Sequence, residues 1–254
     1  MQAGIQLVLD ARFSFLKYQY LYTKLMYMKK LVVLTGAGIS AESGIRTFRD
    51  MGGLWEEYDV MEVASPEAWA SNPELVQRFY NERRKQLFTV EPNAGHIALA
   101  QAEMDFEVHI ITQNVDNLHE RAGSTKIIHL HGELTKVRST GDSNLIYDIG
   151  GKELKMGELC EKGYQLRPHI VWFGEAVPMI SEAAEITAQA DIFAVVGTSL
   201  NVYPAAGLLD YAPMGIPIFL VDPHDVAVYS RRDVTFIKEP ASIGVTKMLQ
   251  MLKS

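Results

Sequence analysis

The sequence predicts an α/β fold: a mostly parallel, doubly wound sheet with helices on both faces, plus a smaller inserted domain. Three observations predict it. Short runs of apolar and β-branched residues, typical of strands buried on both faces, alternate with stretches of helical periodicity. Each run ends in small or polar residues, as strands do at a ligand-binding carboxyl edge. A glycine-rich segment at 136–167 interrupts the alternation and is the expected insertion.

Composition and charge narrow the class of protein. The chain has 254 residues, of which 48% are hydrophobic and 22% charged, enough for one large domain or one large and one small. A net charge of -7 argues against a broad nucleic-acid surface, and no apolar run approaches the roughly 20 residues of a membrane span. Cys160 is the single cysteine, which excludes an internal disulfide and fits a reducing cytoplasm. We expect a cytoplasmic protein with neither nucleic acid nor membrane as partner.

Residues 1–28 form an N-terminal extension of unknown role. The segment is rich in Tyr and Leu but has no small-residue cleavage site after an apolar core, so we do not interpret it as a signal peptide. Met28 and two lysines directly precede the first expected strand. The segment is therefore either an upstream extension or a misassigned start, and we assign it no chemistry.

The first strand, expected at 31–35, runs into a glycine-rich turn. Gly36 and Gly38 permit positive φ and close backbone approach, so amides can face a phosphate, and Ser40 followed by Glu42 suits a helix start. The turn fits the loose G-x-G-x-x-G/A pattern of dinucleotide-binding folds. The acidic residue expected about 20 positions later is missing, and GIRTFR follows directly at 44–49. We interpret the fold as a Rossmann-like variant that holds a diphosphate, and not as a dehydrogenase.

The next stretch is expected to be helical. A loop at 51–65 carries a tryptophan, and loops of this kind often close over cofactors. Pro66 and Pro73 suit the first turns of helices within residues 66–87, where Asn72 is a candidate cap. Another helix follows Asn93, with four residues expected to face inward: Ile97, Leu99, Ala100 and Met104.

Later apolar runs predict the remaining strands, with a helix at 118–122 between the first two of them. The strands are expected at 108–112, 127–130, 170–173, 192–196 and 218–221. Because the carboxyl ends of parallel strands meet at one edge, the polar residues that follow these strands and the glycine turn should surround one crevice. They are Ser40, Asn114, Asp116, His131 and Ser199.

Each of these residues also has a structural interpretation. Asn114 and Asp116 could simply cap the following helix. His129 and His131 share a strand face, so periodicity alone does not choose between them. If the ligand is a nicotinamide nucleotide, His131 beside Gly132 faces the cleft and can accept a ribose hydroxyl proton. We expect structural roles for three other histidines: His96, His119 and His169.

Six motifs, in order, resemble those of the sirtuins. They are GAGIS at 36–40, GIRTFR at 44–49, TQNVD at 112–116, HLHG at 129–132, VWFGE at 171–175 and GTS at 197–199. The resemblance covers about residues 30–254 and implies an NAD-dependent protein-lysine deacylase that takes acyl-lysine proteins or peptides. It also implies release of nicotinamide and O-acyl-ADP-ribose. An ADP-ribosyltransferase and a non-enzymatic NAD-sensing module remain alternatives, and a dehydrogenase is disfavoured.

The resemblance assigns roles to particular residues. His131 would be the general base, with Asn114 and Asp116 at the ribose and carboxamide. The NAD contacts would be Gly36, Ala37, Gly38, Ser40, Glu42, Phe48, Arg49, Gln113, Asn114, Asp116, Gly197, Thr198, Ser199 and Asp222. Asp222 departs from the asparagine of many relatives, although its carboxylate can accept from ribose hydroxyls. The acyl-lysine and its peptide would contact Val171, Phe173, Gly174, Glu175 and Val202.

A further match concerns the acyl group. Tyr80 and Arg83 lie three residues apart, on one helix face, and resemble the Tyr-x-x-Arg of bacterial, class III sirtuins, where the pair reads a dicarboxylic acyl tail. The guanidinium fork suits a carboxylate, and Ala64 would leave room for the tail. We expect removal of succinyl, malonyl or glutaryl groups as well as acetyl. The alternative is a solvated helix face, since Arg84 and Lys85 follow directly.

The chain departs from most sirtuins in its cysteines. Those relatives bind a structural zinc with four cysteines, whereas the corresponding interval here has Ser139 and only Cys160. One thiolate cannot form a tetrahedral sulfur site, so we expect no zinc and no other metal site. The segment would instead be held by an apolar mini-core of Leu145, Ile146, Tyr147, Ile149, Leu154, Met156 and Leu159.

We divide the catalytic domain, 29–254, into two parts. The large Rossmann-like part is expected at about 29–50, 90–135 and 168–254. The small part would consist of the insertions at about 51–89 and 136–167.

Overall fold

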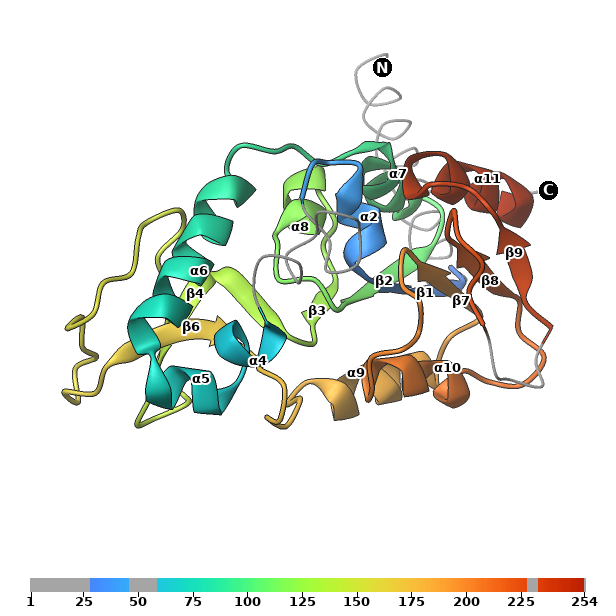
Figure 1. Ribbon diagram of the computed structural model, residues 1–254. Coiled ribbons are helices and arrows are strands. Elements are labelled where there is room, and N and C mark those ends of the chain that lie inside the picture. The colour runs from blue at the N-terminus through green and yellow to red at the C-terminus, as the bar shows by residue number, and fades with distance from the viewer. Residues whose placement is uncertain (1–27, 46–58, 228–232, 254) are drawn as a thin grey trace, which may run out of the picture.

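The computed structural model describes residues 28–45, 59–227 and 233–253 (Figure 1). Its main sheet has six strands in the order β3-β2-β1-β7-β8-β9, and every pairing is parallel. Their bounds are β1 Lys30–Thr35, β2 Glu107–Thr112, β3 Ile127–His129, β7 Ile192–Val196, β8 Ile218–Val221 and β9 Thr235–Ile237. The predicted α/β fold with a parallel sheet is confirmed.

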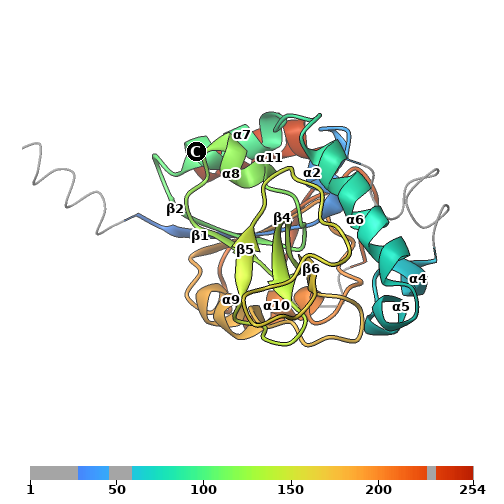
Figure 2. The same cartoon turned by 90° about the vertical axis from the view of Figure 1, so that its left-hand side faces the viewer.

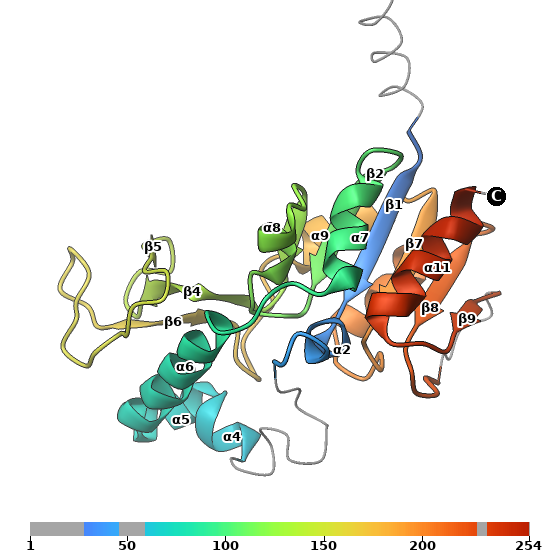
Figure 3. The same cartoon turned by 90° about the horizontal axis from the view of Figure 1, so that it is seen from above.

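Helices cover both faces of this sheet (Figures 1 and 3). On one face lie α7 (Ala94–Ala102) and α11 (Ala241–Lys253), and on the other α9 (Ile180–Thr187) and α10 (Leu208–Tyr211). Alternate residues of β1 enter the two cores: Leu31 and Val33 pack on the α7 side, Val32 and Leu34 on the α9 side. A strand buried on both faces must be apolar at every position, which explains its unbroken hydrophobic run.

A second, antiparallel sheet has the order β5-β4-β6. Its strands are β4 Gly132–Ser139, β5 Ile146–Asp148 and β6 Leu166–Ile170. The helices α4 (Val60–Val63), α5 (Pro66–Ser71) and α6 (Pro73–Leu87) belong to the same part of the molecule, and Figure 2 shows α6 beside this sheet.

The prediction of a strand at 170–173 was wrong both in the position of the strand and in the sheet to which it belongs. The strand is β6, which ends at Ile170 and pairs with β4, so residues 132–135 and 168–170 lie in the second sheet. Beyond Ile170 the backbone bonds elsewhere: the Val171 amide donates to the His131 carbonyl at 2.9 Å and the Phe173 amide to the Ala64 carbonyl at 3.0 Å. Apolar composition alone cannot distinguish this crossing segment from a buried strand.

The helical stretch at 66–87 divides at Asn72 into α5 and α6. The Asn72 side chain accepts from the Leu75 amide at 3.1 Å and so caps α6, as its position predicted. A short helix, α8 (Leu118–Ala122), follows β2 as expected.

The inward face of α7 was predicted incorrectly in part. Leu99 is fully buried, but Ile97 is 42% exposed and Met104, beyond the helix end, is 67% exposed. The buried positions are set by Gly95, where an added Cβ would lie 2.9 Å from the Ala241 carbonyl oxygen of α11. This close helix contact, and not the number of apolar residues, sets the phase of α7.

The second sheet has a small core of its own. Val137, Leu154, Cys160 and Leu166 are buried together, and three expected core residues pack against them: Leu145, Tyr147 and Ile149. The other three expected residues, Ile146, Met156 and Leu159, are exposed. In β5, Tyr147 faces the core, so its neighbour Ile146 must point to the other side.

Hydrogen bonds connect the second sheet and its small core to α6. Asn81 donates from Nδ2 to the Leu154 carbonyl at 2.8 Å and accepts the Leu154 amide at 3.0 Å. Arg84 is fully buried and donates from Nε to the Leu134 carbonyl at 2.6 Å. Arg84 therefore belongs to the interior and is not part of a solvated basic face.

The Glu175 carboxylate joins β4, β6 and the segment after β6. It accepts from Arg167 Nη1 at 2.7 Å, from Arg138 Nη2 at 3.0 Å and from the Trp172 amide at 2.8 Å. Burial raises the pKa of this carboxyl, but the bonds from Arg167 and the Trp172 amide lower it more, so the net pKa lies below its ordinary value.

No described helix is long and apolar enough to cross a membrane.

We expect Glu175→Gln to lower the free energy of unfolding by about 2 kcal/mol at pH 7, because two arginines lose their charged partner. A carboxyl whose pKa is depressed in the folded state stabilises that state above the unfolded pKa, about 4.3 for Glu. The difference between wild type and variant should thus be constant from pH 7 to about 5 and shrink below about 4.3. Urea unfolding at several pH values measures it.

Exposed Glu182 of α9 offers the matched control, Glu182→Gln, which should leave the free energy of unfolding unchanged within about 0.5 kcal/mol. A Glu175→Gln difference that already declines between pH 7 and pH 5 would contradict the depressed pKa.

Candidate functional site

A cavity of about 1030 Å³ opens at the carboxyl edge of the main sheet and extends to α6 and the segment after β6. Every described residue that the sequence analysis assigned to NAD or to the acyl-lysine lines it, including His131. Phe48 and Arg49 lie outside the described residues. The structure therefore brings the described candidates together: those that follow the strands meet because the carboxyl ends of parallel strands share one edge, and the others come from the elements beside it.

The glycine turn forms one wall through contact with the turn after β7. Gly36 donates its amide to the Val196 carbonyl at 3.1 Å, and Gly38 donates to the Gly197 carbonyl at 2.8 Å. Gly197 has φ +64, and a Cβ on it would lie 2.3 Å from the Ile39 amide nitrogen. The short helix α2 (Ala37–Ala41) begins directly after Gly36. The resemblance implies that the amides of Ala37 and Gly38 hold phosphates. Because the Gly38 amide is used inside the protein, only that of Ala37 remains a candidate.

Three buried polar side chains form a network beneath this wall. Ser40 Oγ donates to Asp116 Oδ2 at 3.0 Å, and Asn114 Nδ2 donates to Ser40 Oγ at 3.0 Å and to the Gly36 carbonyl at 3.1 Å. Asp116 also accepts the Leu118 amide at 3.1 Å. The N-cap residue of α8 is Asn117, which makes no side-chain capping bond, so Asp116 bonds the first helical amide from one residue before the cap and also lines the cavity. Burial raises the pKa of Asp116 above its ordinary value.

His131 presents one nitrogen to a backbone carbonyl. Its Nδ1 lies 3.0 Å from the Gln113 carbonyl oxygen, which can only accept, so Nδ1 carries the hydrogen and Nε2 of the neutral ring has a lone pair. Burial lowers the pKa of His131, although the bond to Gln113 raises it in part. The ring therefore stays neutral at physiological pH and can accept a proton from a group in the cavity.

His129 and His119 lie outside the cavity lining, whereas His224 is part of it. His129 donates from Nδ1 to the Asn114 carbonyl at 3.1 Å, and its Nε2 lies 2.6 Å from Glu120 Oε1. His119 is fully buried, and its Nε2 lies 3.1 Å from the Thr35 hydroxyl. Periodicity could not separate His129 from His131, but the position of the cavity does.

The α6 end of the cavity carries the candidate acyl residues. Tyr80 is 4% exposed, its hydroxyl accepts from Trp172 Nε1 at 3.1 Å, and burial raises its pKa to about 12. Arg83 is half-buried with its guanidinium carbon 5.6 Å from the centre of the Phe79 ring, and burial lowers its pKa. Ala64 is 7% exposed. These positions do not form a solvated helix face, so that alternative is wrong.

Sequence reasoning missed the walls around Tyr80 and Arg83. Phe79, Trp172 and Ile170 line the cavity there, and Arg167 lies 3.2 Å from the centre of the Trp172 ring. The sequence shows that these residues are apolar, but only the fold shows that α6 and the segment after β6 lie against each other. Glu175 lines the cavity, yet its carboxylate is occupied by the two arginines.

At the opposite end of the cavity, side chains from separate strands meet. Gln113 Nε2 donates to Thr198 Oγ1 at 3.1 Å, which joins the ends of β2 and β7. Asp222, after β8, accepts the His224 amide at 2.9 Å and lines the same space.

Comparison with known proteins gives a consistent result. The sequence model of the Sir2 family matches residues 36–204. An NAD-dependent protein deacylase of Bacteroides thetaiotaomicron is 56% identical over 230 residues, which span 89% of this chain and 98% of that protein. One of Helicobacter pylori (strain 26695) is 55% identical over 225 residues, with the same two coverages of 89% and 98%.

Similar solved structures include a Sir2 homologue bound to NAD, with a TM-score of 0.80, 37% identity, and coverage of 92% of this chain and 93% of that one. Another is a Sir2 protein with a deacetylated p53 peptide and 3′-O-acetyl-ADP-ribose, with a TM-score of 0.76, 28% identity, and coverage of 92% and 97%. The match of the family model and the identity to these proteins show that this chain belongs to the Sir2 family.

Proposed function

We propose that this chain is an NAD-dependent protein-lysine deacylase that removes succinyl, malonyl or glutaryl groups and also acetyl groups, releasing nicotinamide and O-acyl-ADP-ribose. The observation that carries the proposal is the tautomer of His131. Its Nδ1 hydrogen is held by the Gln113 carbonyl, which leaves Nε2 as a base in a cavity bounded by the glycine turn. The names of the similar proteins support the same activity.

The residues of the cavity suit NAD as a co-substrate. The cavity is large enough, and the close contact of Gly38 with Gly197 leaves no side chain at the wall where a diphosphate would lie. The Ala37 amide and the Ser199 hydroxyl would hold phosphates, Gln113 and Thr198 would line the adjoining edge, and Asp222 would accept from the adenosine ribose. The co-substrate supplies the ribosyl carbon that receives the acyl oxygen as nicotinamide leaves.

Each catalytic side chain then has a defined task. Asn114 and Asp116, held by Ser40, would orient the ribose and carboxamide, because their buried network prevents rotation. His131 would accept a proton from a ribose hydroxyl at Nε2, and its low pKa keeps this nitrogen free. Phe173 and Val171 would flank the lysine stem, with peptide backbone pairing near Gly174 and Val202.

The acyl preference rests on Arg83. Its guanidinium lies near Phe79 in an environment where burial already disfavours charge, so a carboxylate tail would supply the opposite charge and accept two N–H groups. Tyr80 is fixed by Trp172, which would keep its ring beside the tail. The small side chain of Ala64 would leave room for this tail.

We also propose that the second sheet needs no four-cysteine zinc site. Its buried cluster around Leu154 and Cys160, the Asn81 bonds to α6 and the Glu175 ion pairs all stabilise it directly. The single cysteine also supports a reducing, cytoplasmic location. The division into a large and a small part remains part of this proposal, with the second sheet in the small part.

His131→Ala should lower kcat for an acyl-lysine peptide by about 100- to 10,000-fold, the range for loss of a general base. The affinity for NAD should stay within a few-fold of wild type, because the alanine removes only one hydrogen bond, that to a ribose hydroxyl. Nicotinamide release and calorimetric NAD titration measure the two quantities. His109→Ala, in β2 and away from the cavity, is the control with unchanged kcat. Loss of NAD affinity equal to the loss of kcat would refute the base role.

The same assay distinguishes the other activities. Wild type incubated with NAD and succinyl-lysine peptide should yield nicotinamide and deacylated peptide in equal amounts by mass spectrometry. Labelled ADP-ribose attached to protein, without deacylation, would instead indicate the transferase. Binding of NAD without either product would indicate a sensing module.

Arg83→Met should raise KM for a succinyl-lysine peptide by about 10- to 100-fold, which corresponds to the loss of one charge-assisted bidentate contact. KM for the matching acetyl-lysine peptide should change by less than about three-fold. Methionine keeps an unbranched apolar stem in place of that of arginine, so the packing of the stem is largely preserved. The exposed Arg78 of the same helix provides the control Arg78→Met. Equal increases for both peptides would contradict carboxylate recognition.

A further inference from the structure

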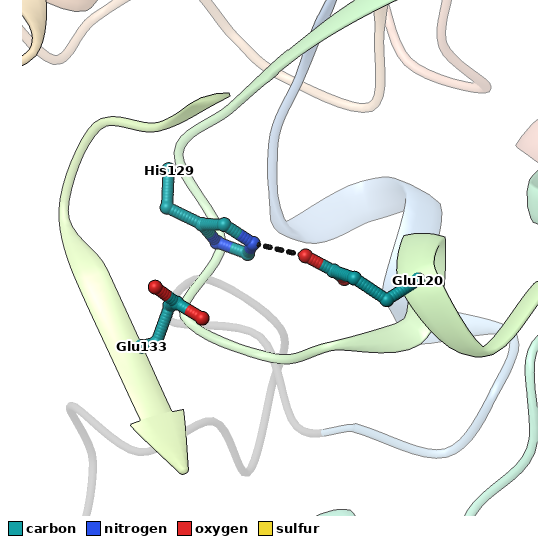
Figure 4. A group of neighbouring side chains, drawn as sticks. All are labelled: Glu120, His129 and Glu133. Carbon is teal, nitrogen blue, oxygen red and sulfur yellow. Dashed lines mark hydrogen bonds and ion pairs between the residues drawn. The ribbon is translucent and has the colours of Figure 1, made fainter. Parts of the chain in front are cut away.

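Outside the cavity, three side chains from different elements converge on one point (Figure 4). Glu120 comes from α8, His129 from the end of β3 and Glu133 from β4. One ligand atom from each, a carboxylate oxygen or an imidazole nitrogen, lies within 4.8 Å of the other two. None of the three lines the cavity, so the proposed deacylation does not use them as ligand contacts.

The His129 ring is held in the orientation of a metal ligand. Its Nδ1 donates to the Asn114 carbonyl at 3.1 Å, so Nε2 is the nitrogen directed at the carboxylates. Histidines that bind metals commonly donate their other ring N–H to a backbone carbonyl in this way, which fixes tautomer and direction. The side chain is only 9% exposed, so packing also limits its rotation.

The contact between His129 and Glu120 requires a positive charge. Nε2 lies 2.6 Å from Glu120 Oε1, and with the hydrogen on Nδ1 both atoms are acceptors. Two acceptors approach this closely only with a proton or a metal ion between them. A tetrahedral ion bound to both at about 2.0–2.1 Å would separate them to about 3.3 Å, so the side chains need to move by less than about 1 Å.

Glu133 forms an ion pair with a lysine in this structure. Its Oε1 pairs with Lys136 Nζ at 2.7 Å, three residues further along β4. A metal ion at the cluster would replace Lys136 as the partner of this carboxylate. Lys136 is therefore a competitor, and its ammonium group should weaken the binding of any divalent ion.

We propose that Glu120, His129 and Glu133 form a binding site for a divalent transition ion of the zinc or nickel class. One imidazole nitrogen and two carboxylate oxygens suit such ions, and two carboxylates balance the ionic charge. Water would complete the coordination. The proposed site is distinct from a four-cysteine zinc site in the second sheet, and the proposal departs from the expectation of no metal site only for this cluster.

The probe is Zn²⁺, titrated calorimetrically into full-length protein that has been treated with a chelator and then freed of it. One Zn²⁺ should bind per chain. Glu133→Gln and Glu120→Gln should each weaken binding at least about ten-fold, since each removes one ligand. Lys136→Met should tighten binding several-fold, because it frees Glu133 from its ion pair.

Two further variants separate the site from nonspecific binding. His129→Gln should abolish binding, with circular dichroism to confirm that the protein is folded. His109 forms a similar pair with Glu107, at 3.0 Å, but is not among the described groups with three converging ligands, so His109→Gln should leave binding unchanged. Absence of saturable Zn²⁺ binding, or binding that neither Glu133→Gln nor Lys136→Met alters, would overturn the proposal and leave an imidazolium–carboxylate pair.

Discussion

The site depends on one backbone contact, that between the turn after β1 and the turn after β7. The two strands are neighbours, and their ends approach so closely that a Cβ on Gly38 would lie 2.7 Å from the Gly197 Cα. The bond from the Gly38 amide to the Gly197 carbonyl holds them there. Because no side chain fits between these turns, the wall of the cavity is bare backbone, and the polar residues on either side of it face the same space.

The buried network of Ser40, Asn114 and Asp116 is a consequence of that contact. Asn114 donates to the Gly36 carbonyl, so the glycine turn itself sets where the β2 loop lies. Asp116 in turn accepts the first amide of α8 while it also accepts from Ser40. The same carboxylate thus bonds the start of α8 and lines the cavity. A buried carboxylate with a raised pKa is costly unless its bonds are satisfied, which restricts the loop to one arrangement.

Much of this could be predicted from the sequence, because the relevant signals are local. The apolar run of β1, the glycine turn and the polar residues after each strand specify a parallel sheet and its rim without any long-range information. Most of the errors concern partners distant in the chain. Nothing near Ile170 indicates that β6 pairs with β4, and nothing near Ile97 indicates that Gly95 packs on α11. Arg84 resembles its exposed neighbour Lys85 in sequence, yet the Leu134 carbonyl draws it inside. Such contacts exist only once the two segments have met.

His129 and His131 illustrate how one local pattern leads to two chemistries. Each ring donates from Nδ1 to a carbonyl of the loop after β2, His129 to Asn114 and His131 to Gln113. Both histidines therefore adopt the same tautomer and differ only in what surrounds Nε2. For His131 the surroundings are the cavity, and burial without an acidic partner lowers its pKa. For His129 burial also lowers the pKa, but the Glu120 carboxylate raises it by more. The loop carbonyls thus set the direction of Nε2, and the tertiary environment decides whether this nitrogen faces the cavity or a carboxylate.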